Sequence, residues 1–489
     1  MAVTKTKKKF AFDVGWVFMS SIVVLILHFF QNPIMARYLG PDGLGLFSMA
    51  IMIMGIVELI ASFGIYDANI KYVAEYKEDK SKLYSLVSSA FITMIISGAI
   101  ASLTLFFFSD TLASVFNMPS LALLLKIYAL ALPFSLVHGI SFGFFTGLRK
   151  MKYHAFIRIL NASLALIFIL ILLMIGLGVV GAILGTIFAL ITTFGVAMVI
   201  IKRLVRFTFS DYQKNMKVLV SFGSRLTGAN IIGEIYNYAD TLMIGYFLTS
   251  TEVGYYAVAI SLGRFFRFIP RAIGQVAYPT ISEYWAKNDI QAINKLADKS
   301  TKYSACILVF AGMSVIFFAE DIVTFLFTPE FLPAVLPLAI LVTGTVTAGI
   351  IRSLGDIFAS VGKVNLLLKI TAIGAVGDVL LNLALIPTYG IIGAATATTA
   401  VYMLIVGIKI YFLRKEVTIK LDTPWFTKMA MLIGLSATLF YVLGFLNYYF
   451  SATITLLLYG VVVIKYLLTK DDYEFFVKIL KDIRHGVFW

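Results

Sequence analysis

The stretch Leu177-Gly-Val-Val-Gly-Ala-Ile-Leu-Gly-Thr186 recurs 212 residues later as Tyr389-Gly-Ile-Ile-Gly-Ala-Ala-Thr-Ala-Thr398. Two weaker matches have nearly the same offset: Leu39–Ala50 with Leu248–Ala259, and the pair Phe145 and Lys150 with Phe358 and Lys363. A near-constant offset in three places predicts two similar halves. Parallel repeats of this kind build transporters that rock around a site between the halves.

The composition places both halves in a membrane. The chain has 489 residues, of which 60% are hydrophobic and only 13% are charged, and its mean hydropathy is +0.94. These values are typical of a polytopic membrane protein. Fourteen apolar segments are long enough to cross a bilayer: 12–36, 43–70, 83–108, 119–146, 154–176, 179–201, 217–248, 252–284, 303–319, 333–360, 364–386, 391–413, 426–446 and 449–469.

We therefore predict an all-α fold of fourteen transmembrane helices. Residues 1–210 would form one six-helix lobe and residues 211–414 a second lobe with the same orientation. Residues 415–489 would add two helices outside the repeat. The last of these residues, Asp471–Trp489, carry apolar side chains at helical spacing with lysines between them, which is typical of a helix lying in the membrane interface.

The distribution of basic residues predicts the orientation. Lysine and arginine clusters precede the first apolar segment and follow every second one, whereas the alternate loops hold mainly aspartate and glutamate. The positive-inside rule then places both termini in the cytoplasm, which an even number of spans requires. The lysines from Lys5 to Lys9 could belong to a signal peptide, but the apolar run after them is too long and lacks a cleavage site.

Three arginines lie inside the apolar segment that runs from about Glu252 to Trp285. At 100° per residue, Arg267 is about 60° and Arg271 about 20° around a helix from Arg264. One such charge costs roughly 2.5–3.5 kcal/mol at the bilayer centre, so a lipid-facing row of three is prohibitive. We therefore expect the row to face a protein interior or a watery cavity.

Other polar side chains form stripes on the first two spans of each predicted lobe. The simplest arrangement has all four stripes lining one central cavity. The candidate cavity residues, with one acidic residue from a later span added, are His28, Asn32, Glu58, Asn230, Glu234, Asn237, Asp240, Gln275 and Asp378.

Two interpretations of these charges remain open. In the functional one, Arg264, Arg267 and Arg271 bind phosphate oxygens, for which planar guanidinium groups are suited. Glu58 or Glu234 would then hold an arginine between ligands or carry a coupling proton. In the structural one, the carboxylates and arginines simply form ion pairs. Asp378, with Asn382 four residues later, is a candidate cation or proton site.

Several activities are excluded by the residues themselves. The single cysteine, Cys306, rules out a disulfide within the chain. The histidines at 28, 138 and 154 do not cluster, so we expect no metal centre. Gly362-Lys363 lacks the upstream glycine of a phosphate-binding loop. We expect neither an enzyme, nor a nucleic-acid partner, nor a cofactor, although coupling to protons, sodium or the membrane potential is possible.

Several short motifs resemble those of one family of membrane transporters. The motifs, in chain order, are Arg37-Tyr-Leu-Gly-Pro-Asp-Gly-Leu-Gly-Leu-Phe47, Asn69-Ile-Lys-Tyr-Val-Ala-Glu75, Glu252-Val-Gly-Tyr-Tyr-Ala257, Tyr278-Pro-Thr-Ile-Ser282 and Ile386-Pro-Thr-Tyr-Gly-Ile-Ile-Gly-Ala-Ala395. Their order and spacing resemble the polysaccharide branch of the multidrug, oligosaccharidyl-lipid and polysaccharide exporter superfamily. That branch includes the Wzx-type O-antigen flippases.

The resemblance implies a flippase of a prokaryotic cell membrane. Its substrate would be a polyprenyl-diphosphate-linked oligosaccharide, moved from the cytoplasmic to the outer leaflet by alternating access, with glycan assembly proteins as possible partners. A cation-coupled exporter of drugs or other amphiphiles is the alternative within the same superfamily. That branch favours a carboxylate in the first span, where this chain has only Asp13 at the edge. A scaffold without transport is a third alternative.

Overall fold

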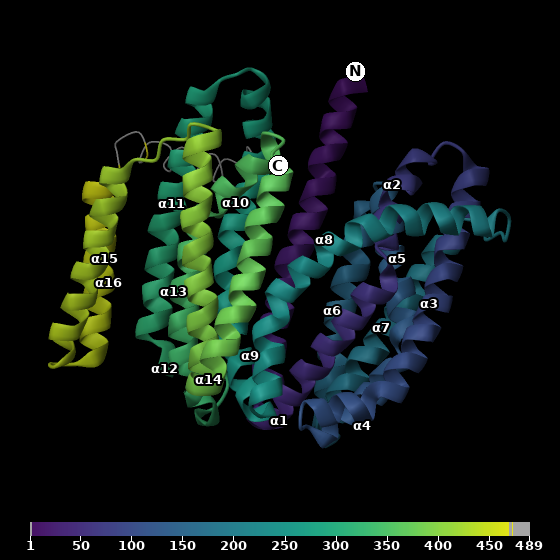
Figure 1. Ribbon diagram of the computed structural model, residues 1–489, viewed down its shortest axis with the longest axis horizontal. Helices are drawn as coiled ribbons and strands as arrows, with labels where there is room; N and C mark the ends of the chain where they lie inside the picture. The colour runs from purple at the N-terminus through teal and green to yellow at the C-terminus, as the bar shows by residue number, and fades with distance from the viewer. Residues whose placement is uncertain (1, 469–471, 473–489) are drawn as a thin grey trace. The chain divides into compact units, whose positions relative to one another are not determined.

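The computed structural model describes residues 2–468 and Asp472, and in this part of the chain there are helices and turns but no strands (Figure 1). Nine of the described helices are long and apolar enough to cross a membrane, or ten if a pair bent by 55° between Ala129 and Leu132 counts as one span. The predicted all-α membrane fold is confirmed, whereas the number fourteen stays a prediction. The predicted interfacial helix at 471–489 lies outside the described residues, apart from Asp472.

The helices form two compact units, the first of which comprises residues 1–261, 323–337 and 371–398. Within it, α6 packs along α7 and α1, and α3 packs along α5 and α4. Its helices up to residue 261 are α1 (Ala2–Ser62), α2 (Ile65–Glu75), α3 (Lys80–Val115), α4 (Pro119–Ala129), α5 (Leu132–Gly147), α6 (Met151–Met174), α7 (Gly178–Lys202), α8 (Tyr212–Phe247) and most of α9 (Ser250–Gly263).

The second unit comprises residues 262–322, 338–370 and 399–489. The elements after α9 are η1 (Arg264–Arg267), α10 (Phe268–Ala286), α11 (Ile290–Phe317), α12 (Ala319–Leu326), η2 (Pro329–Ala334), α13 (Val335–Ser360), α14 (Val364–Glu416), α15 (Thr423–Gly444), α16 (Tyr448–Val462) and the π-helical turn η3 (Val463–Leu467). The predicted division at residues 210 and 414 stays a prediction.

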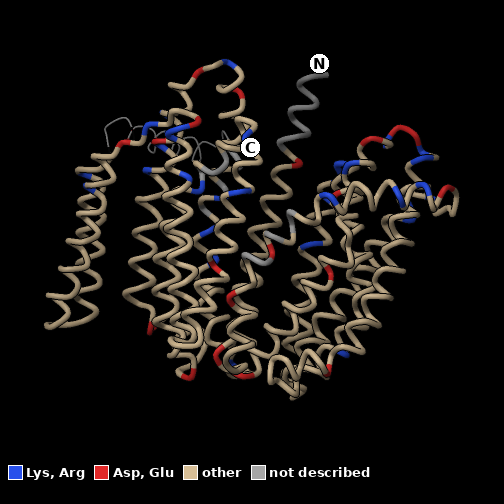
Figure 2. The backbone as a smooth tube through the Cα atoms, viewed as in Figure 1, with Lys and Arg blue, Asp and Glu red and all other residues tan. Residues whose placement is uncertain are grey.

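Most charged residues lie near the ends of the helices, although a few lie within them (Figure 2). Figure 2 shows that, within each unit, Lys and Arg gather mainly at one end of the helices, whereas Asp and Glu prevail at the other end. Charges at helix ends avoid the apolar centre of a bilayer, where a charge is costly. Basic residues gathered at one end are typical of the cytoplasmic side of membrane proteins.

Two glycines break the two longest helices at predicted boundaries between spans. Gly40 in α1 has φ 64° and ψ −176°, and Gly390 in α14 has φ 60° and ψ −140°. A residue before proline avoids the helical region, and Pro41 follows Gly40. Positive φ costs glycine little, so each long helix changes direction at its glycine.

Two of the motifs that suggested the family pack against each other in the first unit. A Cβ on Gly45 would collide with the carbonyl oxygen of Ser250, and a Cβ on Gly254 with that of Pro41. The Ser250 hydroxyl also donates a hydrogen bond to the carboxylate of Asp42. The glycines therefore allow the second half of α1 to touch the start of α9.

Two helix ends at matching positions of the predicted repeat have the same local geometry. The amide of Lys150 donates to the carbonyl of Phe145 at 2.8 Å, and the amide of Lys363 donates to that of Phe358 at 2.7 Å. The residue before each lysine has positive φ, at 54° and 80° respectively. Both ends therefore have the hydrogen bond and the left-handed residue of a Schellman turn.

Candidate functional site

The arginine-bearing segment is not one continuous helix. It consists of α9, the 3₁₀ turn η1 and α10. Pro270 explains the break, because a proline cannot donate to the carbonyl four residues earlier, here that of Phe266, and its ring crowds that carbonyl. The backbone tightens into a 3₁₀ turn just before the proline.

The broken helix aligns the arginines more closely than the continuous helix would. A 3₁₀ turn has three residues per turn, so Arg264 and Arg267, at its two ends, lie one above the other. Arg271 follows one α-helical turn later, and all three side chains are exposed. The part of the second unit that the structure describes offers no acidic partner within ion-pair distance of any of the three.

Arg267 has an aromatic partner that the sequence reading missed. It donates a hydrogen bond to the Tyr402 hydroxyl, and its guanidinium carbon lies 5.9 Å from the centre of the Tyr402 ring. Such a cation–π contact holds the guanidinium without neutralising its charge. Tyr402 follows the repeated Gly-Ala stretch of α14, a position that carries no signal by itself.

Glu58 and Glu234, predicted from two different spans, line one polar pocket in the first unit. The pocket has a volume of about 290 Å³ and is also lined by Ser62, Tyr66 and Tyr238. Glu58 accepts a hydrogen bond from the hydroxyl of Ser135, a partner that the sequence did not indicate. The structure thus brings two of the predicted carboxylates together.

Asp240 and Asp378 form a second acidic cluster in the same unit. Asp240, on α8, accepts hydrogen bonds from the Tyr256 hydroxyl at 2.8 Å and from the amide of Thr241 at 2.7 Å. Asp378, on α14, lies close enough to Asp240 to interact with it electrostatically. Both carboxylates are buried, with 7% and 2% of their surface exposed.

The cluster contains buried polar atoms that lack a hydrogen-bond partner among the described residues. They are one carboxylate oxygen of Asp378, both amide atoms of Asn382 and the hydroxyl of Thr398. Asn382 and Thr398 lie close enough to Asp378 to interact with its carboxylate, but without the geometry of a hydrogen bond. Buried charges normally pair with an opposite charge, bind a cation or become protonated. Two carboxylates, an amide oxygen and hydroxyls are all hard oxygen ligands. The cluster is therefore suited to hold a small cation or a proton.

The other predicted residues are less informative. His28 is exposed, Asn32 is half-buried, and Asn237 donates to the Gly233 carbonyl of its own helix at 2.9 Å. The side chains of Asn230 and Gln275 lie outside the described part of the chain. Since the arginines belong to the second unit and the acidic residues to the first, the single cavity lined by all of them stays a prediction.

The chain has many apolar spans, a row of arginines within its apolar sequence, and buried acidic clusters. These features are those of a multi-pass membrane transporter. The comparison with solved structures bears on the fold. The lipid II flippase MurJ, in its inward closed conformation, superposes with a TM-score of 0.73 at 15% identity, covering 90% of this chain and 97% of that one. An inward-facing multidrug resistance MATE family transporter gives 0.69 at 16% identity, covering 81% and 94%. These likenesses show the fold.

The chain belongs to the polysaccharide biosynthesis protein family, whose model matches residues 10–285, within the multidrug, oligosaccharidyl-lipid and polysaccharide exporter superfamily. A second model, MatE, matches residues 226–384. Similar curated proteins include the "Probable low-salt glycan biosynthesis flippase Agl15" of Haloferax volcanii, 27% identical over 42% of this chain and 44% of that protein. The succinoglycan biosynthesis transport protein ExoT of Rhizobium meliloti is 24% identical over 53% and 51%. The matches thus cover about half the length of these relatives.

Proposed function

We propose that this protein is a flippase that moves a polyprenyl-diphosphate-linked oligosaccharide from the cytoplasmic to the outer leaflet by alternating access. Its product would serve the synthesis of a cell-surface polysaccharide or glycan. Family membership, the flippase and transport names of the similar proteins and the MurJ-like fold support the proposal.

The arginine row is the observation on which the substrate class depends. Arg264, Arg267 and Arg271 present fixed, planar donors from successive turns of one segment. A diphosphate offers several charged acceptor oxygens, and guanidinium groups bind such oxygens in pairs. A row of cations without acidic partners among the described residues is suited to an anionic ligand rather than to an ion pair within the protein.

Two sources of energy fit this charge distribution. An inside-negative membrane potential expels an anion by about 2.3 kcal/mol per charge per 100 mV. The Asp240–Asp378 cluster would bind a coupling sodium ion or proton, and the pocket of Glu58 and Glu234 is a second candidate for proton coupling.

The proposed setting is the cell membrane of a prokaryote. Both termini would lie in the cytoplasm, as the asymmetry of the basic residues predicts. Glycan assembly proteins are plausible partners for such a flippase, because they make its substrate on one side and consume its product on the other.

The decisive experiment is transport by the purified protein in vesicles with a fluorescent lipid-linked oligosaccharide. We expect the double variant Arg264→Ala with Arg267→Ala to lose most transport, because two of three phosphate-binding cations are removed. Arg206→Ala, an exposed arginine after α7, is the matched control and should transport normally. Normal transport by the double variant would refute the diphosphate role.

The multidrug exporter is the second candidate, supported by the MatE model and the MATE-like fold. Its expected carboxylate in the first span is not available here, because Asp13 forms an ion pair with Arg149 at 3.1 Å. Efflux of cationic dyes by the same vesicles, with no movement of the lipid-linked glycan, would favour this candidate over the flippase.

A further inference from the structure

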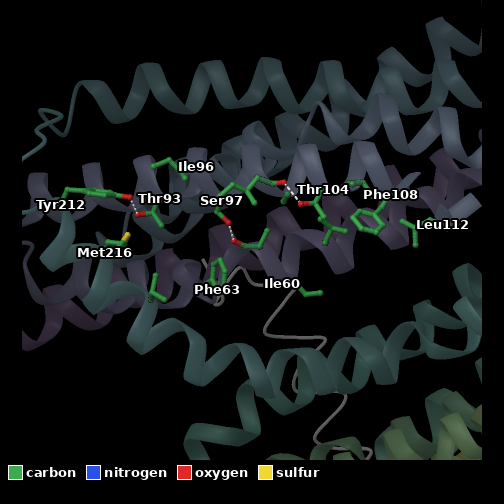
Figure 3. Close-up of a pocket in the computed structure, with 16 residues that line it drawn as sticks. Ile60, Phe63, Thr93, Ile96, Ser97, Thr104, Phe108, Leu112, Tyr212 and Met216 are labelled. Carbon is green, nitrogen blue, oxygen red and sulfur yellow. Dashed lines mark hydrogen bonds between the residues drawn. The ribbon is translucent and has the colours of Figure 1, made fainter. Parts of the chain in front are cut away.

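A long apolar groove lies in the first unit, outside the polar sites described above. It has a volume of about 590 Å³ and is lined by the end of the first long helix α1, by α3 and by the start of α8. Figure 3 shows its side chains in a row, from Tyr212 and Met216 at one end to Phe108 and Leu112 at the other.

Polar groups in the groove are already satisfied within the protein. The Ser97 hydroxyl donates to the carbonyl of Ala61 at 2.6 Å, and the Thr104 hydroxyl donates to that of Ile100 at 2.9 Å. The Thr93 hydroxyl donates to the Ser89 carbonyl at 2.8 Å. Apart from the Tyr212 hydroxyl at one end, which lies 3.5 Å from that of Thr93, a ligand therefore meets a mainly hydrocarbon surface.

The groove has the length of a membrane-spanning chain. Its lining follows α3 from Thr93 to Leu112, which is about 29 Å at 1.5 Å per residue. The hydrocarbon core of a bilayer is about 30 Å thick. The groove follows the length of α3, with α1 and the start of α8 as its other walls, so it suits one extended chain better than the paired chains of a diacyl lipid.

The groove lies beside the polar pocket of the first unit. Val57, Ile60 and Ala61 of α1 line the groove, whereas Glu58 and Ser62 of the same two turns line the polar pocket. The two therefore share α1 as a wall. Neighbouring residues of α3 divide in the same way, with Thr93 in the groove and Met94 in the pocket. The groove therefore runs beside the pocket of Glu58 and Glu234 but is separate from it.

We propose that this groove binds the polyprenyl chain of the lipid-linked substrate, with the chain extended along α3 between Thr93 and Leu112. This inference rests on the proposed flippase function. The groove keeps one end of the substrate in an apolar environment while the polar end crosses the membrane, and it selects for a single long chain.

The test compares chain lengths in the vesicle assay. Ala101→Phe fills the groove, whereas Ala99→Phe places the same ring on an exposed position of α3 outside it. We expect Ala101→Phe to slow transport of a long-chain substrate roughly tenfold. The ring would displace about two methylene groups of the substrate chain from the groove, and their lost burial corresponds to this factor. Transport of a two-isoprene analogue should not change, and Ala99→Phe should affect neither substrate. Equal loss for both chain lengths would overturn the inference.

Direct labelling gives a result that does not depend on transport or on the folding of a variant. A polyprenyl phosphate with a photoreactive chain end should label wild-type residues of the groove, such as Ile100 and Phe108. The exposed Ile95 and Leu103, on the same helix but outside the groove, should not be labelled. A photoreactive diacyl phospholipid is the comparison. If it labels the groove equally well and polyprenyl phosphate does not displace it, the proposal is overturned. Specific labelling without transport would instead refute the flippase function and keep the groove.

Discussion

At the scale of single residues, Arg267 differs from the other two arginines of its row because Tyr402 holds it. The hydroxyl and the ring of Tyr402 fix the guanidinium without neutralising it. Pro270 sets the register, because the 3₁₀ turn that precedes it aligns Arg264 with Arg267. A helix of 3.6 residues per turn would have separated these two by about 60°.

The buried cluster of Asp240 and Asp378 leads to a prediction about ions. Asp378→Asn removes one of two adjacent negative charges. A cation should then bind roughly tenfold more weakly, because one charge-assisted contact is lost. A ligand that binds only the folded state stabilises it, by about 2.7 kcal/mol at 100 times its dissociation constant. Sodium or acid should therefore raise the thermal unfolding temperature of the wild type, and this response should be lost in the variant.

Asp110→Asn is the control for this measurement, because Asp110 is 67% exposed and pairs only with Lys126 among the described residues. It should keep the response of the wild type to sodium and pH. An unchanged response in Asp378→Asn as well would show that the cluster binds neither ion.

At the scale of elements, glycines determine where the long helices break and where they touch. Gly40 and Gly390 break α1 and α14, and Gly45 and Gly254 allow α1 and α9 to approach. Gly64 and Gly223 also lie against each other in the first unit, whereas other contacts there use large side chains such as the fully buried Phe144 and Phe145.

The contact between α1 and α9 predicts a clear difference between two glycine substitutions. Gly254→Ala forces a methyl group into the Pro41 carbonyl, and overpacking of this kind costs about 1–3 kcal/mol. Gly195→Ala in α7 meets nothing within 4 Å and should be neutral or stabilising, since alanine favours a helix. Thermal unfolding in detergent measures both, and equal stability of the two variants would contradict the close contact.

At the scale of the whole molecule, the predicted repeat and the distribution of basic residues together predict one membrane topology. The two turns at Lys150 and Lys363 have the same hydrogen bond and the same left-handed residue. Both belong to loops in which the sequence places basic residues, and both should therefore lie on the same side of the membrane as the termini.

Labelling of single cysteines tests this topology. Cys306 is the only cysteine, so Cys306→Ser gives a background without thiols. Cysteines at Lys77, Arg206 and Lys363 should react with an impermeant maleimide only after the cytoplasmic side is opened, whereas one at Glu330 should react from outside. Labelling of Lys77 and Lys363 from opposite sides would contradict the parallel repeat.

The sequence by itself determined the membrane fold, the positions of the breaks at Gly40 and Gly390, and the identity of the charged residues in the spans. These features depend on apolar length, local backbone preference and the cost of charge in a bilayer, all of which act within short segments. Only the tertiary structure decided which polar groups meet. Tyr402 reaches Arg267, Ser135 reaches Glu58, and Asp378 lies beside Asp240, because helices far apart in the chain pack together, and no local pattern encodes such contacts.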